Sequence, residues 1–186
     1  MTTKQVDELT ALMAEHLQNL FGQACWDDSV DDTVRRWLKA MQEFKQAPSV
    51  PFTPTVFDAS NTDQMVICKG IHFSSLCAHH LFPFSGVAHV AYIPNQKIIG
   101  LSKIPRFVDW LTHKPSTQET STEDIAGTLE ELLNPIGVAV VLEAQHTCMA
   151  CRGVRAHTAS MVTSVMKGAF LTNPNAKQEF LSLIKS

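Results

Sequence analysis

Two short segments of the sequence concentrate side chains that could do chemistry. The first runs from Ser74 to Phe84 and places one thiol and two imidazoles within four residues, those of Cys77, His79 and His80. The second lies much further along the chain and holds another imidazole and two thiols, those of His146, Cys148 and Cys151. Thiolate and imidazole are the ligands that zinc prefers in proteins. The two segments therefore predict a zinc site, provided that folding brings them together.

The spacing of the first segment suits a catalytic form of such a site. Cys77 and His80 are three positions apart, so one turn of the chain can present both to the same ion. With Cys148 as a third ligand, a fourth position would remain for water, whose pKa zinc lowers to about 7. His79 and His146 would then lie near that water without binding the metal. Their ordinary pKa, near 6.5, suits general acid–base catalysis.

Other interpretations of the cysteines stay open. Cys148 and Cys151 form a CxxC pair, which could complete a closed and structural Cys₃His zinc site with Cys77 and His80. The pair could instead be redox-active, and buried cysteines without a chemical role are common. Spacing alone leaves a catalytic zinc, a structural zinc and no metal as alternatives.

Basic residues near these segments suggest an anionic ligand. Lys103 and Arg106 lie at the expected start of a helix that Ser102 can cap, where free backbone amides favour anions. Arg152 directly follows the second cysteine segment, and arginine binds phosphate in a bidentate manner. Any one of these cations would more often be a solvated surface charge. Together, in a chain of net charge −3, they point to a phosphorylated small molecule.

Length and composition set the broad class of protein. The chain has 186 residues, 45% of them hydrophobic, which suits one globular domain with an appended helical segment. The charge balance carries no polyelectrolyte signature, so nucleic acid is not an expected partner. No apolar run approaches the ~20 residues that span a membrane, and the N-terminus lacks the order of a signal peptide. We therefore expect a cytoplasmic protein with reduced cysteines and no membrane partner.

The first part of the chain predicts two amphipathic helices. Apolar residues at spacings of three and four indicate one helix from about Lys4 to Phe21 and another that ends near Phe44. Three prolines then indicate an extended linker. We place the boundary between an N-terminal helical arm, residues 1–48, and a catalytic domain, residues 49–186.

The rest of the chain changes to strand periodicity. The expected strands are Gln64–Lys69, Gly86–Ile93, Gly137–Ala144 and about Ala156–Met166. Pro94–Lys97 reads as a hairpin turn that leads into Ile98–Gly100. Between the two pairs of strands we expect one helix after Ser102 and another capped between Thr120 and Thr122. The order β-β-α-α-β-β predicts an α+β fold with an antiparallel sheet and helices on one face.

The sequence around the cysteine and histidine residues resembles that of the type I GTP cyclohydrolase family. The matching motifs follow in order over about residues 30–186, and as a set they are far more specific than any one of them: Cys77–Phe84, Val87–Pro94, Gly100–Arg106, Gln118–Glu119, Gly137–Val154 and Val162–Phe170. The resemblance implies the tunnelling fold, a β-β-α-α-β-β unit preceded by helices. It also implies a ring-shaped homodecamer of two pentamers, with active sites at subunit interfaces.

The resemblance also implies an activity. GTP and water would become formate and 7,8-dihydroneopterin triphosphate, which feeds pterin, folate and 7-deazaguanine synthesis. Three residues would bind Zn²⁺, namely Cys77, His80 and Cys148. His79 would protonate the imidazole ring of the purine, and His146 and Ser102 would take part in ring opening and rearrangement of the sugar.

Substrate contacts carry over in the same way. Glu119, with Gln118 beside it, would hold the guanine edge, because a carboxylate can accept from both N1–H and the exocyclic amine. Three cations would contact the triphosphate, namely Lys103, Arg106 and Arg152.

The chain departs from the family pattern at a few positions. Ala78 replaces a glutamate, Thr120 and Ser121 replace an arginine and a leucine, and Cys151 is a rare cysteine. Two alternatives to the main function therefore remain. One is an enzyme of the same fold that acts on a related purine nucleotide. The other is a non-catalytic, ring-forming zinc protein with a closed Cys₃His site that includes Cys151.

Overall fold

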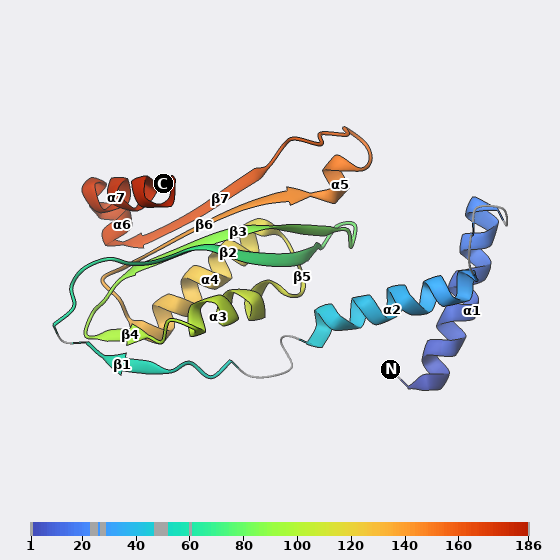
Figure 1. Ribbon diagram of the computed structural model, residues 1–186, viewed down its shortest axis with the longest axis horizontal. Coiled ribbons are helices and arrows are strands. Elements are labelled where there is room, and N and C mark those ends of the chain that lie inside the picture. Colours follow the sequence, from blue (N-terminus) through green and yellow to red (C-terminus); the bar gives the residue numbers. More distant parts are fainter. Residues whose placement is uncertain (1, 23–25, 27–28, 47–51, 60, 186) are drawn as a thin grey trace. The chain divides into compact units, whose positions relative to one another are not determined.

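The computed structural model describes residues 2–22, 26, 29–46, 52–59 and 61–185 (Figure 1). The chain divides into two compact units, Met1–Gln46 and Ala47–Ser186. The expected boundary after residue 48 lies outside the described residues. No described helix combines the length and the apolar character needed to cross a lipid bilayer.

The first unit consists of the two expected helices, α1 (Thr3–Phe21) and α2 (Val30–Gln46). Thr2 caps α1 through a capping box, in which its hydroxyl accepts from the backbone N–H of Gln5 and its own N–H donates to the Gln5 side chain. The two helices share a small apolar core, formed by Ala14, Val30, Val34 and Leu38.

The second unit is built on an antiparallel sheet (Figure 1). Its four long strands lie in the order β2-β3-β6-β7, with bounds Val66–Cys77, Pro83–Ile93, Gly137–His146 and Met161–Gly168. A short strand, β5 (Pro115–Ser116), runs parallel to the end of β2. The predicted α+β class with its antiparallel sheet is confirmed.

The predicted hairpin at Pro94–Lys97 is wrong. β4 (Lys97–Ile99) pairs with β1 (Val56–Asp58) in a separate two-stranded sheet, in the register Val56↔Ile99. The physical reason is that β3 is a central strand, paired with β2 on one edge and β6 on the other, so it has no free edge for β4.

Helices cover the sheet because strand residues alternate between its two faces. α3 (Lys103–Thr112) and α4 (Gln118–Leu133) pack on one face, where Phe107, Ile125 and Leu129 bury Val90, Val140 and Leu142. Two helices after β7, α6 (Ala169–Thr172) and α7 (Pro174–Lys185), pack on part of the other face. Figure 1 shows the two sets on opposite sides of the sheet.

The start of α4 differs from the expectation in a way that affects the site. The N-cap is Thr117, whose hydroxyl accepts from the backbone N–H of Thr120, rather than a residue between Thr120 and Thr122. The helix therefore begins earlier, and Gln118 and Glu119 lie in its first turn.

Candidate active site

Strand register brings the two cysteine–histidine segments together. β3 and β6 pair antiparallel with Phe84 opposite His146, so the start of β3 lies beside the end of β6. The one-turn helix α5 (Thr147–Ala150) follows directly, and the Thr147 hydroxyl donates to the Pro83 carbonyl at 2.7 Å. Cys148 is thereby placed next to the loop between β2 and β3.

That loop has a compact, hydrogen-bonded form. The Cys77 N–H donates to the Phe82 carbonyl, and the Leu81 N–H donates to the Cys77 carbonyl, both at 2.8 Å. Leu81 closes the loop with a φ of 55°, in the left-handed region that most residues avoid. The Ala78 N–H donates to the Ser116 carbonyl at 3.0 Å, which ties the loop to β5. These bonds fix the backbone from which His79 and His80 project.

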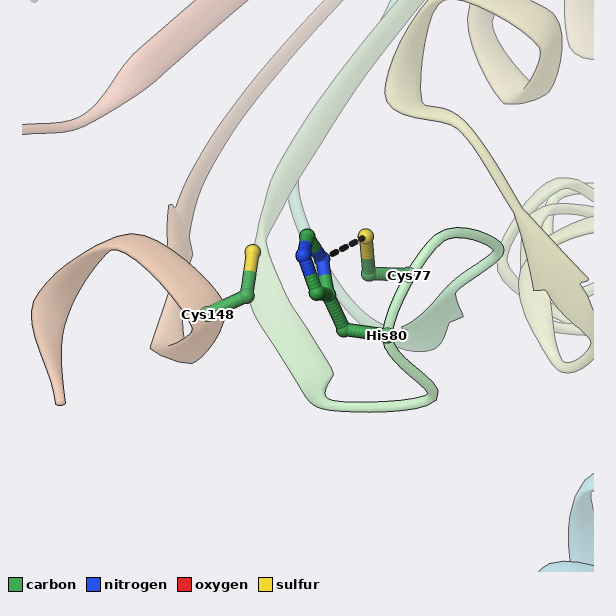
Figure 2. Close-up of side chains that lie close together, drawn as sticks. All are labelled: Cys77, His80 and Cys148. Carbon is green, nitrogen blue, oxygen red and sulfur yellow. Dashed lines mark hydrogen bonds between the residues drawn. The ribbon is translucent and has the colours of Figure 1, made fainter. Parts of the chain in front are cut away.

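Cys77, His80 and Cys148 form a group suited to a metal ion (Figure 2). One ligand atom from each residue lies within 4.8 Å of the other two, and the Cys77 Sγ lies 3.8 Å from the His80 Nδ1. The three side chains come from the end of β2, the following loop and α5. The structure thus brings together the three residues that the sequence predicts as metal ligands.

The donor chemistry of this group fits zinc. Two sulfurs and one imidazole nitrogen are soft and borderline ligands, and a tetrahedral ion would keep one further position. Burial and the neighbouring Cys77 thiol raise the pKa of the Cys148 thiol, while the Arg152 charge opposes them. The thiolate form of Cys148 is therefore disfavoured here, and a divalent ion would compensate its charge.

Cys151 and His79 lie near Cys77, His80 or Cys148 in the sequence, but neither belongs to the three-residue group. Cys151 is exposed and contributes no thiol to the group within the described ranges. His79 approaches Cys77, with its Nδ1 at 3.8 Å from the Sγ, but it is not within reach of all three ligand atoms. His79 is exposed, as is His80.

A cavity of about 500 Å³ opens beside the Cys–His–Cys group. Its lining includes both further imidazoles, of His79 and His146, and the first turn of α4 with Gln118 and Glu119. Glu119 is exposed in the first turn of this helix. The cavity thus combines the Cys–His–Cys group, two further imidazoles and one carboxylate.

The His146 ring is held on two sides. It stacks on the buried Phe84 ring with centroids 4.4 Å apart and an interplanar angle of 7°. Its Nε2 lies 2.8 Å from the Gln118 Oε1. Burial lowers the pKa of His146, and the negative charge of Glu119 opposes that shift.

Gln118 is almost fully buried, and its polar atoms contact protein. Its side-chain amide donates to the Leu142 carbonyl at 3.1 Å, the Met161 carbonyl at 2.9 Å and the Thr163 hydroxyl at 3.1 Å. The sequence places Gln118 beside Glu119, the residue expected to bind guanine, and gives Phe84 and Thr163 no role in the site. No local sequence signal marks these contacts, because they depend on strand register.

Four predicted site residues lie outside the cavity lining. Ser102 and the cations Lys103 and Arg106 are at the start of α3, and the Ser102 hydroxyl makes no capping bond. α3 follows β4 and begins near the end of β3. The Cys–His–Cys group lies at the start of β3, a strand of 11 residues that is roughly 30 Å long. Arg152 is exposed just after α5, close enough to influence the Cys148 thiol.

Comparison with known proteins identifies the chain. The sequence model described as GTP cyclohydrolase I matches residues 10–185. The chain is 44% identical to the GTP cyclohydrolase 1 of a Hydrogenobaculum species over 88% of this chain and 90% of the relative. A Sulfurihydrogenibium protein of the same name is 46% identical over 86% and 84%. That of Hahella chejuensis is 40% identical over 97% of both. The chain therefore belongs to the GTP cyclohydrolase I family.

Proposed function

We propose that this enzyme converts GTP and water into formate and 7,8-dihydroneopterin triphosphate. The observation that carries the proposal is the group of Cys77, His80 and Cys148 beside a cavity with two further imidazoles. Relatives named GTP cyclohydrolase 1 match most of the chain, and they support the same activity. The product would supply pterin and folate or 7-deazaguanine synthesis.

Zinc is the proposed metal, held by Cys77, His80 and Cys148. A zinc ion held there would supply the Lewis acidity needed to activate water for attack on the purine ring. The three protein ligands come from separate elements, so correct folding of β2, β3 and α5 is needed to assemble the group.

His79 is proposed as the acid that protonates the imidazole ring of the purine. It lies in the cavity lining next to the metal group but outside the three donors, which leaves its ring available for proton transfer. His146 is proposed to move protons in the later steps of ring opening and sugar rearrangement, together with Ser102. His146 also lines the cavity.

Glu119 is proposed to read the guanine base. Its carboxylate lies in the first turn of α4, exposed at the cavity, and can accept from N1–H and the exocyclic amine together. Such a pair of charge-assisted bonds would select guanine over adenine, which presents a different pattern of donors and acceptors.

The triphosphate contacts are proposed to come partly from a neighbouring subunit. Lys103, Arg106 and Ser102 lie far along the domain from the metal group of their own chain, so a second copy must bring them to the cavity. A homodecamer of two pentamers, with active sites at subunit interfaces, would provide this arrangement. Arg152, beside α5, would add a further cation from the chain that holds the metal.

Two alternatives make different predictions. A non-catalytic protein with a closed Cys₃His site needs Cys151 as a ligand, and the exposure of Cys151 outside the group argues against it. An enzyme acting on a related purine nucleotide retains support from Ala78 and Thr120.

A panel of nucleotides tests the proposal. Zinc-loaded protein is incubated with GTP, dGTP, GDP and GMP, and formate is measured. We expect the fastest release from GTP. Faster release from another nucleotide of the panel would favour an enzyme that acts on a related purine nucleotide. No formate from any of the four nucleotides would rule out the proposed reaction.

A further inference from the structure

We infer that Gln118 is a positioning residue that fixes the proton of the neutral His146 ring on Nε2 and leaves the lone pair of that ring on Nδ1. The assignment of the proton stands on the hydrogen-bond network alone. Its catalytic consequence rests on the proposed function. The inference gives Gln118 a role other than contact with guanine.

The orientation of the Gln118 amide follows from its partners. The carbonyls of Leu142 and Met161 only accept hydrogen bonds, and they lie 3.1 and 2.9 Å from the Gln118 Nε2. Reversing the amide would point Oε1 at two carbonyl oxygens inside the protein. Acceptors would then face each other with no proton between them, and buried polar groups would lose their hydrogen bonds. The free-energy cost of this arrangement exceeds that of the observed orientation. The amide nitrogen therefore faces the carbonyls, and Oε1 faces His146.

Two threonine hydroxyls support the same orientation. The Thr122 hydroxyl donates to the Gln118 backbone carbonyl at 2.7 Å, which uses its single proton. The 2.6 Å contact between the Thr122 and Thr163 hydroxyls must then be donated by Thr163. Thr163 accordingly has only lone pairs to offer the Gln118 side chain, 3.1 Å away, and accepts from its amide nitrogen.

The consequence falls on His146. Because the Gln118 Oε1 can only accept, the 2.8 Å contact requires a proton on the His146 Nε2. The neutral ring then carries its lone pair on Nδ1, the nitrogen that Gln118 does not engage. Stacking on Phe84 restricts rotation of the same ring. Gln118 therefore sets which nitrogen of the neutral ring carries the lone pair, as an orienting partner does for a catalytic histidine.

The burial of Gln118 separates this role from substrate binding. The residue is 1% exposed, and its side-chain oxygen and nitrogen both have protein partners. A positioning role predicts an effect on kcat, whereas a guanine contact predicts an effect on KM.

Neutron diffraction from crystals of the intact protein in D₂O tests the proton assignment without reference to activity. We expect a deuteron on the His146 Nε2, directed at the Gln118 Oε1, and two deuterons on the Gln118 Nε2. A bare His146 Nε2, or a reversed amide, would overturn the inference. If GTP turnover were absent while the deuterons were found as expected, only the proposed function would fail.

Steady-state kinetics test the catalytic consequence. In Gln118→Leu we expect kcat to fall by roughly 10- to 100-fold, with KM for GTP within about twofold of the wild-type value. The matched control is Lys167→Met, which removes ion pairs of 2.7 and 3.2 Å from Lys167 on β7 to Glu123 and Glu130 on α4, far from His146. Thermal unfolding of both variants separates loss of fold from loss of positioning. A raised KM with unchanged kcat would assign Gln118 to the substrate instead.

Discussion

Cys148 and Cys151 lie at the start and just past the end of the same helical turn, yet only Cys148 contributes its sulfur to the group with Cys77 and His80. The Cys151 N–H donates to the Thr147 carbonyl, which completes the turn, and the Cys151 side chain is exposed. A CxxC pair is thus divided between the Cys–His–Cys group and a surface thiol. This division favours three protein ligands over a closed site.

Serine substitutions test the division directly. We expect Cys148→Ser to lose at least tenfold in zinc affinity, because a neutral hydroxyl replaces a thiolate. The matched control, Cys151→Ser, should keep one zinc per chain and most of the activity. Zinc content after dialysis measures both variants. Loss of zinc from Cys151→Ser alone would restore the closed-site interpretation.

His79→Ala separates metal binding from proton transfer. His79 is next to the metal group but outside its three donors, so we expect the variant to keep its zinc and to lose about 10²- to 10⁴-fold in turnover. His80→Ala is the contrasting variant, and it should lose zinc and turnover together. Full turnover by His79→Ala would contradict the role of His79 as an acid.

Mixed oligomers test whether neighbouring subunits share an active site. Arg106→Ala removes a cation at the start of α3, and Cys148→Ser removes a metal ligand at the other end of the domain. If one site combines both regions from different chains, co-expression should rebuild some intact sites, and activity should exceed the mean of the two single variants. Activity equal to that mean would place all the needed groups in one chain.

Removal of two neighbouring hydroxyls in α4 should affect thermal stability differently. Ser121 is fully buried, and its hydroxyl has no hydrogen-bond partner within the described residues, so Ser121→Ala should leave Tm unchanged or raise it by up to about 4 °C. Thr122→Val breaks bonds to the Gln118 carbonyl and the Thr163 hydroxyl and should lower Tm by a few degrees. Thermal unfolding of both variants provides the comparison, and a lower Tm for Ser121→Ala would indicate a partner for its hydroxyl in the assembled protein.

Local sequence patterns were sufficient for most of the fold. Period-two and period-3.6 patterns indicate the four long strands and the long helices, because burial of one face imposes those periods. The bounds differ: β2 continues to Cys77 rather than ending at Lys69, and β7 begins at Met161 rather than near Ala156. They could not show that β3 is a central strand, so the hairpin at Pro94–Lys97 was predicted wrongly. The cap of α4 was misplaced because several residues near its start are good caps, and only backbone geometry selects Thr117.

The site was predictable in its chemistry and less so in its supporting contacts. Ligand types and spacing nominated Cys77, His80 and Cys148, and register in the sheet brings them together. Two of the partners of Gln118 are backbone carbonyls of β6 and β7, which any residue type could provide. No residue pattern can therefore report them before the strands are paired.

We expect zinc-loaded protein to open the purine ring of GTP and release formate. Formate and pterin fluorescence are followed in the same reaction, with Cys77→Ser as the metal-free control. The wild-type protein should form one formate for each pterin, and the control should form neither product. Protein with a full complement of zinc that binds GTP but releases no formate would contradict this expectation.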